Sequence, residues 1–370
     1  MIQALIAFAV SVVVNLLVLR IAKHNAHALD HDLSGPQKFH RKPVPRIGGL
    51  GILLGVAAGL LAFELVAAPT AEARDITHVG WLLLACGLPA FGAGIIEDLT
   101  KKVSPGKRLL ATALSGLLAA WALGALIRHT ATPGLDALVA TTAGAYAFTL
   151  LVVAGTANSV NIIDGFNGLA SMCVVIMMSA VAYVAYQAND SVVFTLALLG
   201  IGATLGFFIW NFPAGSIFLG DGGAYFLGFL FAELSILLLV RNPGEVSPLF
   251  PLLVCIYPVF ETVFSAYRRK VLRGQSAGSP DGMHLHSLIY RRVMRWALEE
   301  EDVRALTHRN SMTSPFLWLL CMLSVMPAVL FWDQTALLAV CLVLFVVTYL
   351  VLYWNIVRFR SPAWLHVGRP

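Results

Sequence analysis

Residues 335–357 read TALLAVCLVLFVVTYLVLYWNIV, a predominantly apolar run that contains no charged side chain. A helix of about 20 such residues crosses the hydrocarbon core of a bilayer, which is roughly 30 Å thick. Similar blocks recur along the whole chain, in which 58% of the residues are hydrophobic and only 12% are charged. A soluble protein of this length would need more polar surface than that to cover its core. We therefore predict an all-α, polytopic integral membrane protein.

Eleven apolar blocks are long enough to count as spans, and together they predict one transmembrane domain over residues 1–370. The blocks lie near 4–21, 47–68, 79–96, 109–128, 137–155, 168–186, 191–210, 223–240, 248–266, 314–332 and 335–357. The first block lacks the basic flank and cleavage pattern of a signal peptide, so we interpret it as a span. A large loop is expected at 268–312, with an amphipathic helix at 285–306 lying on the membrane surface.

The basic residues fix the expected orientation. When the first loop, 23–46, is placed in the cytoplasm, 22 of the 25 Lys and Arg residues fall on that side. Only Arg74, Arg128 and Arg241 fall outside, in agreement with the positive-inside rule. Eleven spans then put the N-terminus outside and the C-terminus in the cytoplasm. Because the net charge of +5 follows this topology, we predict a membrane partner and no nucleic-acid partner.

The most specific polar motif is NSVNIIDGFNGLA at residues 158–170. Asn158, Asn161, Asp164 and Asn167 recur at every third position, a spacing that makes successive side chains neighbours on a helix surface. The glycines that follow the last two permit tight turns or the close approach of a ligand. A helix cap needs only one such polar residue, so we interpret the motif as a binding site on the cytoplasmic side.

An acidic pair, Glu97 and Asp98, ends another apolar block and precedes Lys101, Lys102 and Lys107. Carboxylates beside lysines are typical of a site that holds a divalent metal ion and phosphates. Taken alone, the pair fits a solvated helix end equally well.

Two further motifs directly precede apolar blocks on the same side. In FLGDGG, residues 218–223, Asp221 stands either in an ordinary turn or at a helix N-terminus where it can share a metal ion. In HRKPVPRIGG, residues 40–49, Arg46 either anchors the chain at the membrane surface or binds phosphate.

The large loop carries DGMHLH at residues 281–286. His284 and His286 share one side only in an extended conformation, and a zinc site would need more ligands than this segment offers. We expect phosphate or sugar contacts, with solvated loop histidines as the alternative. Glu261, at the cytoplasmic end of a span, is expected to pair with the cations at 268–270.

In their order along the chain, HxxPxPRxGG, the acidic pair, NxxNxxDGxxGLA, FLGDxG and HxH resemble the polyprenyl-phosphate N-acetylhexosamine-1-phosphate transferases. The resemblance runs from His40 to His286. It implies transfer of a sugar 1-phosphate from a UDP-sugar to undecaprenyl phosphate with release of UMP, in a bacterial cytoplasmic (inner) membrane. It also implies a magnesium cofactor, which manganese could replace, and a product that starts a surface glycan such as O-antigen or capsule. The oligomeric state is open between a monomer and a homodimer.

The resemblance further implies roles for individual residues. Asp98, Asp164 and Asp221 are the expected catalytic residues, and Asp221 and Asp98 are the expected metal ligands, with removal of a proton from the lipid phosphate as a second role for Asp98. The expected substrate-binding residues are Asn158, Asn161, Asn167, Lys107, Arg46, His284 and His286.

Three positions depart from the family pattern. Glu97 stands where the family usually has Asp, Asn167 stands at the second acidic position of a DGxDG pattern, and Ser287 stands where a further histidine often follows HxH. Because the three catalytic carboxylates remain, we expect an active enzyme of a distinct subfamily.

Two other functions remain open on the sequence. Phospho-MurNAc-pentapeptide transfer belongs to the same family, but the PxPRxGG form and the single HxH favour an amino-sugar donor. A transporter or lipid flippase would also have many spans, but it would place polar residues near the bilayer midplane and often show internal repeats. Here the polar clusters lie at the span ends on one side.

Overall fold

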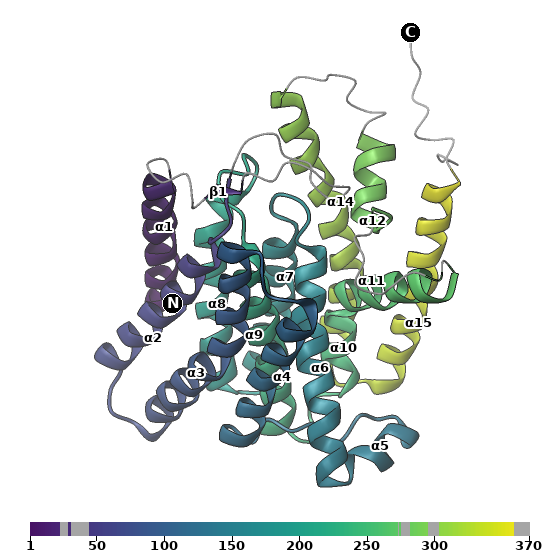
Figure 1. Ribbon diagram of the computed structural model, residues 1–370. Helices are drawn as coiled ribbons and strands as arrows, with labels where there is room; N and C mark the ends of the chain where they lie inside the picture. The colour runs from purple at the N-terminus through teal and green to yellow at the C-terminus, as the bar shows by residue number, and fades with distance from the viewer. Residues whose placement is uncertain (23–28, 31–43, 273, 275–281, 295–302, 359–370) are drawn as a thin grey trace.

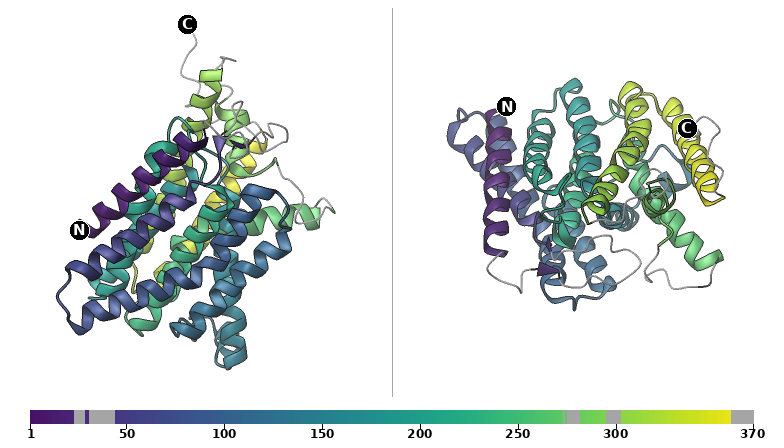
Figure 2. Two further views of the ribbon diagram at one scale, coloured as in Figure 1. Left: turned by 60° about the vertical axis from the view of Figure 1, so that its left-hand side comes forward. Right: turned by 90° about the horizontal axis from the view of Figure 1, so that it is seen from above.

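The structure is a computed structural model, and it describes residues 1–22, 29–30, 44–272, 274, 282–294 and 303–358 (Figure 1). Within these ranges the regular secondary structure is helical, except for a two-residue antiparallel pairing of β1 (Leu29–Asp30) with β2 (Val44–Pro45). Seen from above in Figure 2, the first and the last helices of the chain lie on opposite sides of the bundle. The prediction of an all-α polytopic membrane protein is confirmed.

The long helices are α1 (Ile2–Ala22), α2 (Gly49–Val66), α3 (Ala71–Thr100), α4 (Pro105–Ala122), α6 (Thr142–Ile163), α7 (Leu169–Gln187), α8 (Ser191–Asn211), α9 (Gly220–Arg241), α14 (Val303–Leu330) and α15 (Thr335–Val357). The shorter elements are α5 (Pro133–Val139), α10 (Leu249–Val254), α11 (Ile256–Tyr267), α12 (Leu285–Leu288) and two π-helical segments, η2 (Arg268–Leu272) and η3 (Ile289–Met294).

Nine helices in the described part of the chain are long and apolar enough to cross a membrane, so the predicted count of eleven is not confirmed. The two remaining predicted spans correspond to α4 and to the pair α10 and α11. Helix α4 carries Lys107 and Arg108 in its first turn. The segment predicted as one span at 248–266 divides at Cys255, and α11 runs across the direction of the bundle (Figure 1).

The large loop differs from its prediction as well. Residues 273, 275–281 and 295–302, Asp281 among them, lie outside the described residues, as does His40 of the first loop. The amphipathic helix predicted at 285–306 lies partly outside the described residues; of its described part, α12 leads directly into η3 and α14 begins at Val303. All four residues of α12 are buried inside the protein instead of lying at its surface, since tertiary contacts outweigh the local pattern.

Helix α9 is the central helix of the bundle. Every residue from Gly220 to Leu238 is buried, and α9 contacts α2, α3, α4, α6, α7 and α8. A helix that is apolar on all sides is expected in such a position. Because α9 begins with the FLGDGG motif, the fold places Asp221 where several helices meet.

At its other end, α9 is held by charged groups. Arg241 donates from Nε to Asp190 at 3.0 Å and from Nη2 to Asp75 at 3.0 Å. Asp190 is buried, and it also accepts from the backbone N–H groups of Val192 and Val193 at the start of α8. One of the three cations predicted outside the cytoplasm thus joins α9 to the first turns of α3 and α8.

Small residues fix α1 between α2 and α8. A Cβ atom placed on Gly55 of α2 would lie 2.6 Å from the Ala7 carbonyl oxygen, and one on Gly202 of α8 would lie 2.3 Å from the Ala4 carbonyl oxygen. In membranes, where lipid removes most of the hydrophobic drive between helices, glycine promotes packing by letting backbones approach. The glycines of α2 at this contact recur every fourth residue, at Gly51, Gly55 and Gly59.

We expect Gly55→Ala to lower the melting temperature of the detergent-purified protein by about 5 °C, because the added methyl group overpacks a backbone contact. Gly92→Ala in α3 is the matched control, since a Cβ atom there meets nothing within 4 Å. Intrinsic fluorescence during heating measures both variants. Equal melting temperatures for the two would show that the glycine contact does not hold α1.

Candidate active site

Two motifs far apart in the sequence run side by side at one end of the bundle. The Phe218 N–H donates to the Pro45 carbonyl at 2.9 Å, and the Gly48 N–H donates to the Phe218 carbonyl at 3.0 Å. The Gly49 N–H then donates to the Leu219 carbonyl at 3.0 Å. These backbone bonds place the segment that carries Arg46 against the start of α9.

Glycines let α9 approach α3 closely. Gly220 has a φ of +76°, and a Cβ atom on it would lie 1.9 Å from the Arg46 carbonyl oxygen and 2.6 Å from Asp98 Oδ2. A Cβ atom on Gly94 of α3 would lie 2.3 Å from the Gly222 nitrogen. With no side chains between the helices, Asp98 accepts hydrogen bonds from the N–H groups of Asp221 and Gly222, both at 3.0 Å. A carboxylate at a helix N-terminus is a favourable arrangement.

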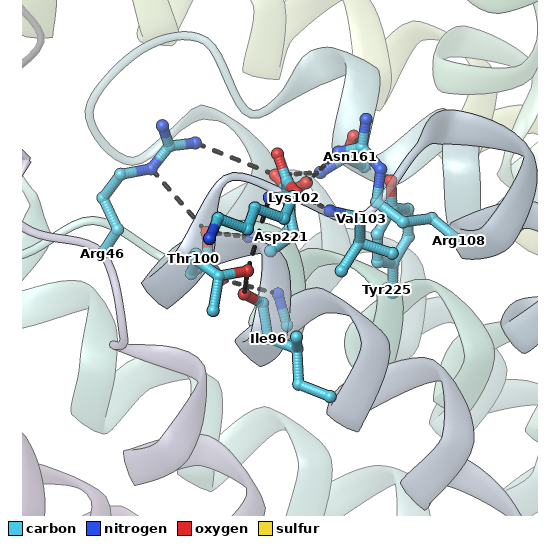
Figure 3. Close-up of polar contacts among 12 residues, drawn as sticks. Arg46, Ile96, Thr100, Lys102, Val103, Arg108, Asn161, Asp221 and Tyr225 are labelled. Carbon is cyan, nitrogen blue, oxygen red and sulfur yellow. Dashed lines mark hydrogen bonds and ion pairs between the residues drawn. The ribbon is translucent and has the colours of Figure 1, made fainter.

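Asp221 lies at the centre of the cluster (Figure 3). Arg108 of α4 donates from Nη1 to Asp221 Oδ2, and Asn161 of α6 donates from Nδ2 to Oδ1 at 3.0 Å. The Arg46 guanidinium lies 3.8 Å from Asp98 Oδ1 and 3.8 Å from Asp221 Oδ1. The Asp98 side chain is fully buried and that of Asp221 is 11% exposed. Two carboxylates therefore face two arginines in a small volume.

Asp164 belongs to the same electrostatic cluster. It follows the last residue of α6 and is partly buried. Burial raises the pKa of the Asp164 carboxyl to about 7; the Arg46 cation opposes this rise, and the negative charges of Asp221 and Asp98 add to it. The structure thus brings the three predicted catalytic carboxylates together, at a distance where each affects the charge of the others.

The donor set fits a magnesium ion. Carboxylate oxygens are the ligands that Mg²⁺ prefers, and it commonly uses one or two of them together with water and substrate phosphates. The described residues include no group of three His, Cys, Asp or Glu side chains arranged to hold a metal ion. Asp98 and Asp221 could therefore hold a magnesium ion that also binds phosphate, but they do not form a closed protein cage.

The histidine pair lies against the turn that follows Asp164. The His284 and His286 rings stack with centroids 5.1 Å apart, and both side chains are buried. The His286 ring also makes an edge contact with Phe166 at 5.5 Å, and a Cβ atom on Gly165 would lie 3.1 Å from His286 Nε2. The alternative of solvated loop histidines is wrong, and the HxH motif joins the motif at 158–170.

Glu261 of α11 fixes this pair. Its Oε1 lies 2.9 Å from His284 Nδ1 and accepts from the Leu285 N–H at 3.2 Å, and its Oε2 accepts from the Tyr349 hydroxyl at 2.6 Å. The prediction that Glu261 pairs with the cations at 268–270 is wrong. Arg268 instead donates to the Met283 carbonyl at 2.9 Å, because the chain returns through the loop and brings His284 to the carboxylate.

Asn167 lies in a buried network beneath the site. Its Nδ2 donates to the Pro213 carbonyl at 3.1 Å and to Ser311 Oγ at 3.3 Å. Its backbone N–H donates to Asn310 Oδ1 at 2.9 Å, and its carbonyl accepts from Ser314 Oγ at 2.6 Å. The motif at 158–170 is therefore not one helical surface: α6 ends at Ile163, and Asn167 fixes the turn to α14. The sequence signal for these contacts of α14 was the group of polar residues at the start of the apolar block at 314–332.

On α4, the basic residue that reaches the carboxylates is Arg108. Lys107, which the sequence assigned to phosphate, is exposed one residue earlier on α4. Adjacent residues of a helix point about 100° apart, so only one of the two can face α9. Asn158 also points elsewhere than Asn161, since its Nδ2 donates to Thr112 of α4 at 3.2 Å and to its own helix.

Glu97 closes the turn after α3. Its Oε2 accepts from the Val103 N–H at 2.8 Å, six residues further along the chain. The longer side chain of Glu suits this bond, which gives the first departure from the family pattern a local structural role.

Residues 80–239, which contain most of this cluster, match glycosyl transferase family 4. A probable undecaprenyl-phosphate N-acetylglucosaminyl 1-phosphate transferase of Bacillus subtilis (strain 168) is 31% identical over 287 residues, which cover 77% of this chain and 77% of that protein. The chain belongs to glycosyl transferase family 4. Family membership confirms the resemblance drawn from the motifs, identifies the chain as a transferase and rejects the transporter alternative.

Two further relatives have names that state different substrates. A decaprenyl-phosphate N-acetylglucosaminephosphotransferase of Mycobacterium tuberculosis (strain H37Rv) is 28% identical over 67% of this chain and 65% of that protein. A phospho-N-acetylmuramoyl-pentapeptide-transferase of Corynebacterium jeikeium (strain K411) is 30% identical over 64% of this chain and 77% of that protein.

We expect Asn167→Asp to destabilise this family 4 enzyme by about 2 kcal/mol at pH 8, because an ionised carboxylate cannot donate to the Pro213 carbonyl. Burial favours the neutral form of the introduced carboxyl, which raises its pKa above the unfolded value, so the loss should shrink when the pH is lowered toward 5.5. Thermal unfolding at both pH values measures this effect, with Asn189→Asp at an exposed position as the control. A stable variant that binds substrate less tightly would instead support the predicted direct contact of Asn167 with substrate.

Proposed function

We propose that the enzyme transfers an N-acetylhexosamine 1-phosphate from a UDP-sugar to undecaprenyl phosphate, releases UMP and so initiates a surface glycan. The observation that carries this proposal is the convergence of three carboxylates and two arginines at one end of an apolar bundle. They come from five separate segments of the chain: Arg46 before α2, Asp98 of α3, Arg108 of α4, Asp164 after α6 and Asp221 of α9. The names of the relatives from Bacillus and Mycobacterium support the same reaction.

The reaction joins two phosphates and therefore needs positive charge. An oxygen of the lipid phosphate forms a bond to the sugar-bearing phosphorus of the donor, and the bridging bond to UMP breaks. A magnesium ion held by Asp221 and Asp98 would neutralise the diphosphate and stabilise the departing UMP. Arg46 and Arg108 add fixed positive charge beside these carboxylates, which suits a site for two anionic substrates.

The contacts of Asp98 favour one of its two expected roles. Its two oxygens accept from two different backbone N–H groups, which holds the carboxylate in one position. That arrangement suits a fixed ligand better than a base that moves to meet the lipid phosphate. The Asp164 carboxyl is not held in this way by backbone N–H groups of the described residues, and we assign to it the exchange of a proton with the acceptor. Asn161 contacts Asp221 and the histidine pair packs against the turn after Asp164, and these are the residues we assign to the sugar nucleotide.

The membrane location follows from the two substrates. A lipid acceptor requires a site at the bilayer boundary, and a soluble nucleotide donor requires the cytoplasmic boundary. We place the protein in a bacterial inner membrane with the carboxylate cluster in the cytoplasm, the N-terminus outside and the C-terminus inside. The uneven distribution of Lys and Arg supports this orientation.

Purified protein with undecaprenyl phosphate and Mg²⁺ should release UMP from UDP-GlcNAc, and chelation of the metal should stop the release. Asp221→Asn should lower the rate by about 100-fold, because it removes the charge expected to hold the metal ion. Asp333→Asn, at an exposed turn on the opposite end, is the control. Rapid turnover by Asp221→Asn would contradict the metal role.

The same assay separates the second candidate function. The relative from Corynebacterium favours phospho-MurNAc-pentapeptide transfer, whereas the single HxH motif followed by Ser287 favours an amino-sugar donor. Turnover of UDP-MurNAc-pentapeptide in place of UDP-GlcNAc would replace our proposal with this second one.

Labelling tests the orientation. In intact cells, a membrane-impermeant maleimide should label Glu245→Cys and leave Lys102→Cys unlabelled, and inverted vesicles should give the opposite result. Both positions are exposed and lie at opposite ends of the bundle, whereas four of the five native cysteines are buried and Cys341 is half-buried. Labelling of Lys102→Cys from outside would invert the proposed topology.

A further inference from the structure

Within the described part of the chain, Arg108 makes one hydrogen bond in the site, and one of its buried N–H donors has no acceptor. Its Nη1 donates to Asp221 Oδ2 (Figure 3), while its side chain is 19% exposed. Its Nε–H is buried and has no hydrogen-bond acceptor among the described residues. A guanidinium carries five N–H donors in a planar fork, and a buried donor without an acceptor costs free energy. The ion pair with Asp221 therefore leaves Arg108 incompletely bonded.

Asp221 has both of its oxygens engaged. Asn161 donates to Oδ1, which also lies 3.8 Å from the Arg46 guanidinium, and Arg108 binds Oδ2 directly. A divalent cation that takes Oδ2 as a ligand competes with the Arg108 guanidinium, because two positive charges in contact with one carboxylate oxygen repel each other. The Asn161 amide carries no charge and opposes such a cation far less. Arg108 is thus the group that competes most directly with a metal ion.

We propose that Arg108 is the counter-ion of Asp221 in the cation-free enzyme, and that it moves to a phosphate oxygen of the sugar nucleotide when a divalent cation takes Asp221. The inference rests on the proposed function. It deepens that function by making Arg108 a substrate-binding residue that the sequence did not identify. No covalent bond changes in this exchange, and the guanidinium stays protonated throughout.

The chemistry of the nucleotide suits the exchange. The diphosphate of the donor would bind the same cation, which would bring its oxygens close to the carboxylate that Arg108 leaves. Phosphate accepts two parallel N–H bonds from an arginine fork, which would satisfy the Nε–H together with a terminal nitrogen. The buried donor without an acceptor is then explained as a group whose acceptor arrives with the substrate.

The change of partner by Arg108 couples the binding of the divalent cation to the binding of the nucleotide. Without nucleotide, a cation weakens the Arg108–Asp221 pair and gives the guanidinium no new partner in exchange. With nucleotide, the released guanidinium finds a phosphate, so each ligand should tighten the binding of the other by the same factor. The phosphates couple the two ligands by binding the cation directly, and an Arg108 that only held α4 to α9 would add nothing to that coupling.

Binding of Mn²⁺ to the nucleotide-free protein, followed by electron paramagnetic resonance, tests the proposal. Arg108→Met should bind Mn²⁺ about fivefold more tightly than the wild type, because its competitor is gone. Arg108→Lys, which keeps the charge, should stay near the wild-type affinity. Lys107→Met removes the same charge one residue away at an exposed position, so a general effect of net charge would show there too.

A second measurement adds UMP. It should tighten Mn²⁺ binding to the wild type and do so several-fold less in Arg108→Met, whose turnover of donor should also fall. Mn²⁺ affinity of Arg108→Met within twofold of the wild type would overturn the counter-ion role. Equal tightening by UMP in both proteins would overturn the transfer of Arg108 to phosphate.

Asp221→Asn separates this proposal from the one on which it rests. If the wild type binds Mn²⁺ and Asp221→Asn does not, the metal site stands whatever Arg108 does. If both bind equally, the proposed metal site itself fails. Should Arg108→Met not fold, Arg108→Gln provides the same loss of charge with a polar side chain, and its thermal unfolding is measured alongside.

Discussion

The site depends on the contact between the Asp98 carboxylate and the first turn of α9. Two backbone N–H groups, those of Asp221 and Gly222, are satisfied by one side chain from another helix, and this is possible only because Gly94 and Gly220 leave the backbones in contact. The contact sets the separation of the two carboxylates, and it seats the Arg46 segment against the same turn. A larger residue at either glycine would separate α3 from α9 and disperse the charges.

Much of the fold could be predicted from the sequence, because the length of an apolar run and the position of a glycine depend only on neighbouring residues in the chain. The apolar runs identify most of the helices, and Gly168, with a φ of +73°, turns the chain where the motif suggested a turn. What could not be predicted depends on how helices rotate about their axes and which of them touch. That is why Arg108 takes the place expected for Lys107, and why Glu261 meets His284 from a loop 23 residues away. It is also why Asn158 and Asn161, one helical turn apart, serve different contacts.

Two of the three departures from the family pattern have local structural roles. Glu97 spans a turn that it helps to close, and Asn167 donates hydrogen bonds that an ionised aspartate could not make. Asn167 lies outside the group of charges around Asp221, and Glu97 borders that group through its electrostatic interaction with Arg108. The changed residues therefore alter the scaffold and leave the three central carboxylates as they are.

Helix α9 also carries a consequence for the depth of the site in the bilayer. Its 22 residues give it a length of about 33 Å, close to the thickness of the hydrocarbon core. Asp221 occupies one end and Arg241, bound to Asp190 and Asp75, occupies the other. Sliding α9 along its axis would pull a charged group out of its pairing at one boundary or the other. The paired charges at its two ends therefore hold α9 at one depth in the bundle, and with it the level of Asp221 relative to the neighbouring helices.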